Sequence, residues 1–459
     1  MTRTRLLFLV LVGALLLPGQ PATAQRAAGA QERARLDSLA RAFLATARTP
    51  GLAVFVLRGN DTLLLRGYGY ADLEDSTPAT PRTVFRVGSL TKQFTAALVM
   101  QLVQEGRIAL DDTIQKFLPD YPAQGHRITI RHLLTHTSGI RSYTSLGQEW
   151  QRVWRLDLTR DTLLAMFATK PFDFAPGERY LYNNSGYYLL GVILERATGR
   201  TYEQLLQDRL VQPLGLADTR YCSMQPIVPR RAQGYARTPA GFVNSDWISM
   251  TQPFAAGALC STVLNLVTWT RALWAGRVVL PASLQEMTTR MRLNSGTSTG
   301  YGFGLGIDSL AGHYRVSHGG GINGFTSYLA HFPDDGVIVA VLDNTEDASP
   351  GRLADHLARV ALGVPLPVVR DLPLTAAERA RYVGSYALGS MTLRVFEQGD
   401  VLMAQATGQG ADRLRSQGQH SFVPTFDDAA RVEFEVAGDR ATGLILHQGG
   451  RVLRAARSN

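Results

Sequence analysis

The sequence predicts an α+β protein with an antiparallel sheet flanked by terminal helices, an inserted helical region, and a small all-β barrel after it. Three observations lead to this fold class. Strand-like segments occur near residues 51–70 and return near 313–344, helix-like segments fill the interval, and short alternating segments follow residue 375. With 459 residues, 45% hydrophobic and 19% charged, the chain is long enough for more than one globular domain.

The first 24 residues have the composition of a signal peptide. Arg3 and Arg5 precede an apolar run from Leu6 to Leu17, and Ala22-Thr23-Ala24 supplies the small residues of a cleavage site. The run is shorter than the roughly 18 to 20 residues of a bilayer span, which favours a cleaved signal over an uncleaved anchor. We expect a periplasmic or secreted protein with no stable membrane insertion after cleavage.

The larger domain is expected over residues 33–365. Residues 31–46 place Leu36, Leu39, Ala40, Phe43 and Leu44 on one stripe of an amphipathic helix. Two strand-like runs then meet at Gly59-Asn60, a favourable hairpin connection. Later segments with strand character cover 313–320, 325–332 and 336–344, and a helix follows over about 352–362. This arrangement predicts one sheet assembled from both ends of the domain.

A second domain is expected over residues 372–459, after the linker at 365–374. Its short alternating segments are typical of an antiparallel barrel or sandwich. We also consider that this barrel carries a lipid or a peptide. The expected strands are 382–388, 391–398, 400–407, 420–427, 432–439, 441–448 and 451–458.

Charge and cysteine content exclude some classes of function. The net charge of +9 falls to 9 − 2 = +7 when Arg3 and Arg5 are removed, and the remaining basic residues are scattered, so we expect no nucleic-acid partner. Cys222 and Cys260 are the only cysteines; we predict a disulfide between them and no metal site or other cofactor.

The segment VGSLTKQF, which begins at Val87, carries the first candidate catalytic pair. A helix that starts at about Ser89 places Ser89 and Lys92 on one face, so the amine can contact the hydroxyl. The positive end of the helix dipole favours a developing alkoxide at Ser89. Only three lysines occur in the chain, and the apolar residues after Lys92 predict a buried helix, where an amine is costly unless it is used. A capping serine followed by a surface lysine is the alternative.

Two further segments carry groups suited to acyl transfer. Tyr182, Asn183 and Asn184 precede an apolar helix, where a tyrosine oxygen can move a proton and an amide can bind a carbonyl. Asn183 and Asn184 also suit turn and N-cap positions. At residues 318–321, a strand runs into His-Gly-Gly-Gly, whose backbone can approach a ligand closely.

These elements, in the order Ser-x-x-Lys, Tyr-x-Asn and His-x-Gly, resemble the serine β-lactamase and D,D-peptidase superfamily, with its class C and esterase-like branch the nearest. The segments ITIRHLLTHTSGI from Ile128 and PFAAGALCSTVLNLVTW from Pro253 are also similar to that family. The resemblance covers roughly residues 33 to 362. The segment after about residue 370 looks similar to the lipocalin-like barrel of some members.

The resemblance implies an acyl-enzyme mechanism. Ser89 would be the nucleophile, with Lys92 and Tyr182 as the proton-transfer pair. Asn184, His318 and Gly320 would bind substrate, and the backbone N–H groups of Ser89 and Gly321 would stabilise the oxyanion. The residues leave open whether Lys92 or Tyr182 is the acylation base.

His318 departs from the lysine that efficient β-lactamases of this superfamily carry at that position. Because a neutral histidine is a weaker partner for a carboxylate than an ammonium, peptide and ester substrates are favoured over antibiotics. The expected activity is hydrolysis of D-amino-acid peptides, β-lactam-like compounds or small esters by an exported serine hydrolase. The alternative is a penicillin-binding sensor or scaffold with little turnover, and the oligomeric state is left open.

Three other patterns are set aside. Residues 296–300 match Gly-x-Ser-x-Gly but lie in a polar loop without the strand-to-helix context of a nucleophile elbow. The glycines at 319, 321 and 324 match a dinucleotide fingerprint but lead into a strand. His132 and His136 have metal-ligand spacing, but no glutamate of a zinc protease lies between them, and both are predicted to be structural.

Overall fold

A computed structural model describes residues 22–47, 49–238, 240–388, 391–407, 411–425, 428, 430–448 and 451–458. The predicted signal peptide lies outside this part of the chain, except for Ala22 to Ala24, which begin helix α1 (Ala22–Thr46). Among the described helices, none combines the length and the hydropathy that a membrane span requires.

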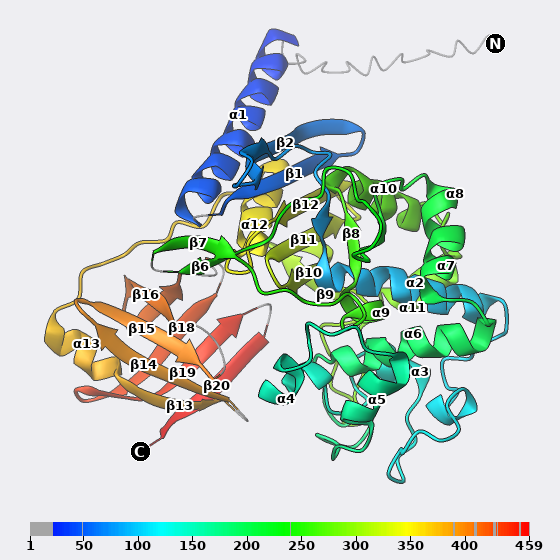
Figure 1. Ribbon diagram of the computed structural model, residues 1–459. Coiled ribbons are helices and arrows are strands. Elements are labelled where there is room, and N and C mark those ends of the chain that lie inside the picture. The colour runs from blue at the N-terminus through cyan, green and yellow to red at the C-terminus, as the bar shows by residue number, and fades with distance from the viewer. Residues whose placement is uncertain are drawn as a thin grey trace, which may run out of the picture.

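A seven-stranded antiparallel sheet is the centre of the larger domain (Figure 1). Strand β1, from the start of the domain, pairs with β12, from its end, with Val54 opposite Val341. This confirms the prediction of one sheet assembled from both ends. The spatial order is β3 (Thr77–Pro78), β2 (Asp61–Asp72), β1 (Gly51–Arg58), β12 (Val337–Asp343), β11 (Phe325–Phe332), β10 (His313–Ile322) and β9 (Gly306–Leu310).

The strands β1 and β12 are buried on both faces, which explains their nearly continuous apolar sequences. On one face, Val54 packs in a core with Leu36 and Phe43 of α1 and with Leu357 of α12 (Pro350–Ala361). On the other face, Phe55 belongs to the core of the helical region. The terminal helices therefore cover one side of the sheet, as the amphipathic stripe predicts (Figure 1).

The inserted region is mainly helical, and its central helix, α2, is buried along nearly its whole length. Two small sheets, β4-β8-β5 and β6-β7, lie within it and were not predicted, because their strands are only two to four residues long. The helices are η1 (Gly88–Leu90), α2 (Thr91–Gln104), η2 (Ile114–Lys116), α3 (Ile130–Leu134), η3 (Tyr143–Ser145), α4 (Gln148–Gln151), α5 (Arg160–Ala168), α6 (Asn184–Thr198), α7 (Tyr202–Leu206), η4 (Gln207–Val211), α8 (Gln212–Leu214), α9 (Phe254–Gly257), α10 (Val263–Trp274) and α11 (Pro281–Met287). The short strands are β4 (Phe85–Arg86), β5 (Arg220–Tyr221), β6 (Tyr235–Thr238), β7 (Gly241–Asn244) and β8 (Leu259–Ser261).

The C-terminal domain is a closed eight-stranded antiparallel barrel preceded by α13 (Ala376–Tyr382). Seven strands match the predicted segments; the unpredicted β16 exposes mostly polar side chains and buries only Leu414 and Ser416. The strands are β13 (Gly384–Leu388), β14 (Met391–Gln398), β15 (Val401–Ala406), β16 (Ala411–Gly418), β17 (Ser421–Pro424), β18 (Arg431–Ala437), β19 (Arg440–Gln448) and β20 (Arg451–Ser458).

Apolar side chains of the described barrel residues form one core inside the barrel. The ring centroids of Phe422 and Phe434 lie 4.8 Å from that of Tyr382. Small barrels whose interiors are filled in this way leave little room for a ligand, which argues against the carrier hypothesis. The barrel contacts the larger domain where Arg352 donates to the Thr425 carbonyl and His356 Nε2 lies 3.1 Å from Asp428.

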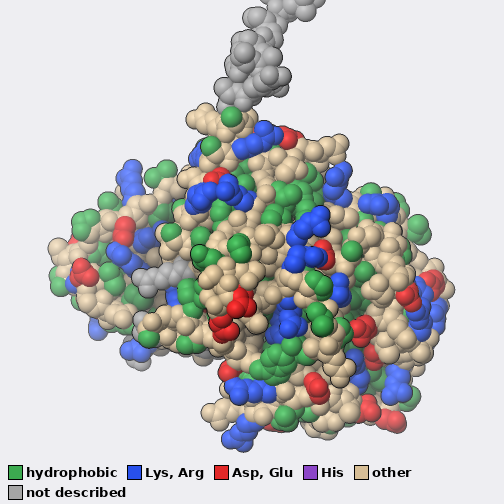
Figure 2. Space-filling model, turned by 45° about the horizontal axis from the view of Figure 1, so that its top comes forward, with side chains coloured by type: hydrophobic (Ala, Val, Ile, Leu, Met, Phe, Trp, Pro, Cys, Tyr) green, Lys and Arg blue, Asp and Glu red, His purple; other side chains and the backbone are tan. Residues whose placement is uncertain are grey.

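Charged side chains are interspersed on the face of the molecule shown in Figure 2, where blue and red groups stand among neutral ones. Several of the basic residues on the surface pair with neighbouring acids, as Arg230 does with Asp218 and Arg209 with Glu105. This face therefore has the mixed character of an ordinary protein surface.

Candidate active site

Ser89 lies in the short helix η1, which continues directly into α2. Gly88, immediately before it, has φ of +50°, and a Cβ there would lie 2.9 Å from the Gly321 nitrogen. A residue with a side chain would both strain the backbone and collide with β10. Glycine at this position therefore lets the nucleophile segment lie directly against the strand that carries His318.

Lys92 is fully buried one helical turn after Ser89. Its Nζ donates to Ser89 Oγ over 3.2 Å, to Asn184 Oδ1 over 2.8 Å and to the Ala256 carbonyl over 2.8 Å. All three partners are neutral, and burial lowers the pKa of Lys92 well below its usual value. The neutral form of this amine has two N–H groups for the two amide oxygens and a lone pair that can accept the Ser89 proton.

Tyr182 lies across the amine, with Lys92 Nζ 4.8 Å from the centre of its ring. Its hydroxyl is hydrogen-bonded to Ser89, and burial nevertheless raises the pKa of Tyr182 far above its usual value. The residue as a whole keeps 36% of its surface exposed, although its hydroxyl is buried. Tyr182 is thus a protonated phenol in contact with the nucleophile at neutral pH.

The two asparagines after Tyr182 have different tasks. Asn183 is the N-cap of α6, and its Oδ1 accepts from the Gly186 amide over 2.8 Å. Asn184 directs its Oδ1 to Lys92 and its Nδ2 to Thr144 Oγ1 over 3.1 Å. The cap fixes the start of the helix and so aims Asn184 at the amine.

His318 is 8% exposed on β10, and its Nε2 lies 2.8 Å from Tyr301 Oη. Burial lowers the pKa of His318 to about 4. The imidazole is therefore neutral at pH 7. Tyr301 was not singled out from the sequence, because a tyrosine in a polar loop has no local pattern that assigns it to a histidine 17 residues away.

The glycines after His318 differ in their surroundings. A Cβ on Gly320 would lie 2.1 Å from the Val87 carbonyl oxygen, so this glycine permits close packing of β10 on the segment before Ser89. A Cβ on Gly321 would meet nothing within 4 Å, so the space on the side-chain side of this residue is open. Substrate binding by Gly320 and oxyanion stabilisation by Gly321 remain predictions; the structure brings both next to Ser89.

The two histidines with metal-ligand spacing contact protein groups. His132 completes a capping box with Thr129 at the start of α3. His136 is buried among tyrosine rings, and its Nδ1 accepts from the Asn183 amide over 3.1 Å. His136 thereby supports the cap of α6. Ser298, the serine of the Gly-x-Ser-x-Gly sequence, donates to the Thr299 carbonyl in a loop.

The structure has Cys222 and Cys260 as buried free thiols, and the disulfide between them stays a prediction. The antiparallel register places Cys260 opposite Arg220, and the Cys222 amide donates to the Ala258 carbonyl. The cysteines therefore stand on a diagonal of the β5–β8 pair, and their thiols contact each other through a hydrogen bond. Sequence separation could not distinguish such contact from a covalent bond.

Comparison with known proteins gives consistent matches. A family model described as Beta-lactamase matches residues 36–363. Penicillin-binding protein 4* of Bacillus subtilis (strain 168) is 27% identical over 435 residues, which cover 88% of this chain and 94% of that protein. A D-aminopeptidase of Gluconobacter oxydans (strain 621H) is 29% identical over 357 residues, which cover 76% of this chain and 66% of the relative.

Solved structures agree with this grouping. The octameric penicillin-binding protein homologue from Pyrococcus abyssi has a TM-score of 0.69 and 26% identity and covers 92% of this chain and 99% of its own. A D-amino acid amidase from Ochrobactrum anthropi SV3 has a TM-score of 0.65 and 25% identity, and the match covers 72% of this chain and 99% of the amidase. Together with the Ser89–Lys92–Tyr182 geometry, these matches mean that the chain belongs to the beta-lactamase family and is a serine hydrolase acting on amide bonds.

Proposed function

We propose that the protein is an exported hydrolase that cleaves amides and small esters of D-amino acids through an acyl-enzyme on Ser89. The observation that carries this proposal is the neutral environment of Lys92, whose two carbonyl partners leave one position of the amine for Ser89. Such an amine is a base in contact with a nucleophile, the arrangement that acyl transfer requires.

Lys92 is proposed as the acylation base. Burial lowers the pKa of Lys92 and raises that of Tyr182, which favours the neutral amine and the protonated phenol, so the amine is the proposed proton acceptor. In acylation, Ser89 Oγ attacks the substrate carbonyl carbon and its proton moves to Lys92 Nζ. Tyr182 then passes its hydroxyl proton to the leaving nitrogen or oxygen as the bond to the carbonyl carbon breaks, and the proton held by Lys92 moves to Tyr182, which restores the neutral amine and the phenol.

In deacylation, water replaces Ser89 as the nucleophile and Ser89 Oγ becomes the leaving group. A water molecule loses a proton to the same basic pair and attacks the ester carbon, the bond to Ser89 Oγ breaks, and the proton returns to Ser89. The backbone amides of Ser89 and Gly321 are the proposed oxyanion donors in both steps, and each such donor typically contributes about 3 kcal/mol of transition-state stabilisation.

The state of His318 supports the substrate class. A neutral imidazole held by Tyr301 does not attract a carboxylate as an ammonium does, so amides and esters are favoured over β-lactam antibiotics at this position. The names of the relatives, a D-aminopeptidase and a D-amino acid amidase, support D-amino-acid substrates. Export rests on the composition of residues 1–24.

The test is a substrate screen with the purified full chain and its Ser89→Ala variant. D-alanine p-nitroanilide, its L-enantiomer, p-nitrophenyl acetate and nitrocefin are compared under steady-state and pre-steady-state conditions. We expect turnover of the D-anilide in excess of the L-form and none by Ser89→Ala. Equal hydrolysis by both proteins overturns the proposal, and a burst without turnover supports the sensor alternative.

Export has its own test. After expression with residues 1–24 intact in a bacterial host, N-terminal sequencing of the periplasmic fraction should give a chain that begins after Ala24. A full-length chain in the cytosol contradicts the proposal.

A further inference from the structure

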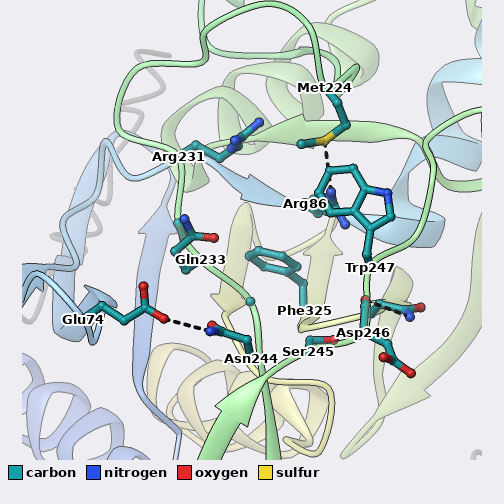
Figure 3. A pocket seen from close by; sticks show the side chains of 13 residues that line it. Glu74, Arg86, Met224, Arg231, Gln233, Asn244, Ser245, Asp246, Trp247 and Phe325 are labelled. Carbon is teal, nitrogen blue, oxygen red and sulfur yellow. Dashed lines mark hydrogen bonds between the residues drawn. The ribbon is translucent and has the colours of Figure 1, made fainter. Parts of the chain in front are cut away.

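A pocket of about 260 Å³ takes no part in the mechanism above (Figure 3). Two segments that frame the active site also form this pocket. Arg86 stands three residues before Ser89, and Asn323 follows Gly321 by two residues, in the turn after β10. The side chains that matter are Arg86, Arg231, Trp247 and Phe325, with the amides of Gln233 and Asn323 beside them.

Arg86 is a buried cation, only 8% exposed, with weak partners. Its Nη2 donates to Met224 Sδ over 3.3 Å, and it also contacts the thiol of Cys222. Its guanidinium stands 5.6 Å from the ring centre of Trp247 and 5.9 Å from that of Phe325. Sulfur atoms and ring faces are poor substitutes for a carboxylate.

Arg231 adds a second cation to the same pocket. Its Nη1 is buried and has no hydrogen-bond partner among the described residues. The positive charge of Arg231 lowers the pKa of Arg86, as does burial, so the two guanidinium groups repel each other. An unpaired buried donor of this kind costs free energy unless a ligand satisfies it.

Another buried arginine shows how this chain neutralises such a charge. Arg315 is 7% exposed, and it binds Asp308 through two nitrogens at 2.7 Å and Asp355 through a third at 2.5 Å. No carboxylate in the described part of the chain forms an ion pair with Arg86. The nearby acids are engaged elsewhere, since Glu74 accepts from Asn244 Nδ2 over 2.7 Å and Asp246 pairs with Arg155.

We propose that this pocket is a carboxylate-binding subsite, in which Arg86 and Arg231 bind the free carboxylate of an N-acylated D-amino acid or peptide. The choice of a D-amino-acid ligand rests on the proposed function. The ligand carboxylate gives Arg86 and Arg231 the negative partner that Asp308 and Asp355 give Arg315. Trp247 and Phe325 cover the apolar part of the ligand. The chain thus carries its anion recognition on the segment before Ser89 rather than at the neutral His318.

The test measures equilibrium binding by calorimetry to full-length Ser89→Ala protein. The probes are N-acetyl-D-alanine and its uncharged counterpart, N-acetyl-D-alanine amide. We expect the carboxylate to bind at least about tenfold more tightly than the amide, as for a charge-assisted hydrogen bond. Arg86→Gln should remove this preference, and Arg86→Lys should retain part of it.

Two more variants keep the test decisive. Arg231→Gln changes a less buried residue and should reduce the preference even if Arg86→Gln fails to fold. Arg230→Gln is the control, because Arg230 is its exposed neighbour paired with Asp218, and it should leave the preference unchanged. Equal binding of the two probes, or a preference that survives both Arg86→Gln and Arg231→Gln, overturns the subsite. Binding to Ser89→Ala needs no turnover, so a failed substrate screen and a failed subsite give different results.

Discussion

The catalytic cleft and the C-terminal barrel both bury aromatic rings, but they bury them around different groups. In the barrel, Tyr382 and Phe434 pack with aliphatic side chains. In the cleft, the rings of Tyr182 and Tyr187 lie against the Lys92 amine, whose hydrogen-bond partners are all neutral. Apolar burial stabilises the barrel, whereas the cleft retains groups whose charged forms burial disfavours. The difference teaches that the barrel is built for stability and the cleft for proton transfer.

Replacing the buried amine of Lys92 should lower catalytic activity more than any of the changes below. Lys92→Met keeps the volume of the side chain but removes the base, so we expect kcat/KM for an amide substrate to fall about 10³-fold. Lys116→Met is the matched control, because Lys116 is an exposed lysine paired with Asp112, and its activity should not change. A loss of less than tenfold in Lys92→Met contradicts the role given to the amine.

Removing one oxygen from Tyr182 should have the next largest effect on turnover. Tyr182→Phe keeps the ring beside Lys92 but removes the hydroxyl that contacts Ser89, so kcat should fall about 10²-fold without loss of stability. Tyr121→Phe provides a comparison, since Tyr121 is a buried tyrosine whose hydroxyl has no hydrogen-bond partner among the described residues. Equal kinetics in both variants would show that the Tyr182 hydroxyl carries no proton.

A cavity in the barrel should affect stability and leave turnover nearly unchanged. Phe434→Ala removes a buried ring from the barrel core and should lower the free energy of unfolding of the barrel by about 3–5 kcal/mol. Steady-state rates at a temperature where the barrel remains folded should stay within twofold. Val452→Ala, at an exposed barrel position, is the control for urea unfolding. Turnover that declines in parallel with barrel stability would make the barrel part of the catalytic unit.

Asp343 should alter the pH dependence of stability and leave turnover unchanged. Burial raises the pKa of Asp343 to about 7, above the value near 3.9 of an unfolded aspartate. The folded state therefore binds the proton more tightly, and this stabilisation is complete below about pH 4 and is lost as pH rises through 7. Asp343→Asn should flatten the fall in unfolding free energy between about pH 4 and 7, whereas Asp75→Asn on an exposed turn should not. An unchanged slope in Asp343→Asn contradicts this assignment.

The main features of the fold follow from local patterns in the sequence. The stripe of Leu36, Ala40 and Phe43 and the hairpin at Gly59-Asn60 both predict elements that the structure contains. The polar strand β16 and the two-residue strands escape prediction, because side-chain alternation needs several residues to become visible.

The site is predictable where motifs are local and not where contacts are distant. Ser89 and Lys92 lie on one helix, so their spacing predicts their contact. The Ala256 carbonyl, the Tyr301 hydroxyl and the His136 ring reach the site only through the tertiary fold. The cysteines illustrate the same limit, because sequence separation does not determine whether two neighbouring thiols are bonded.

The most direct test of the central claim is to identify the residue that forms the covalent adduct. The wild-type protein is incubated with a fluorophosphonate, digested, and analysed by tandem mass spectrometry. We predict one adduct per chain, on the peptide that contains Ser89, and none in Ser89→Ala. An adduct on Ser298, or a Ser89→Ala protein that labels as fully as the wild type, would contradict the assignment of Ser89 as the nucleophile.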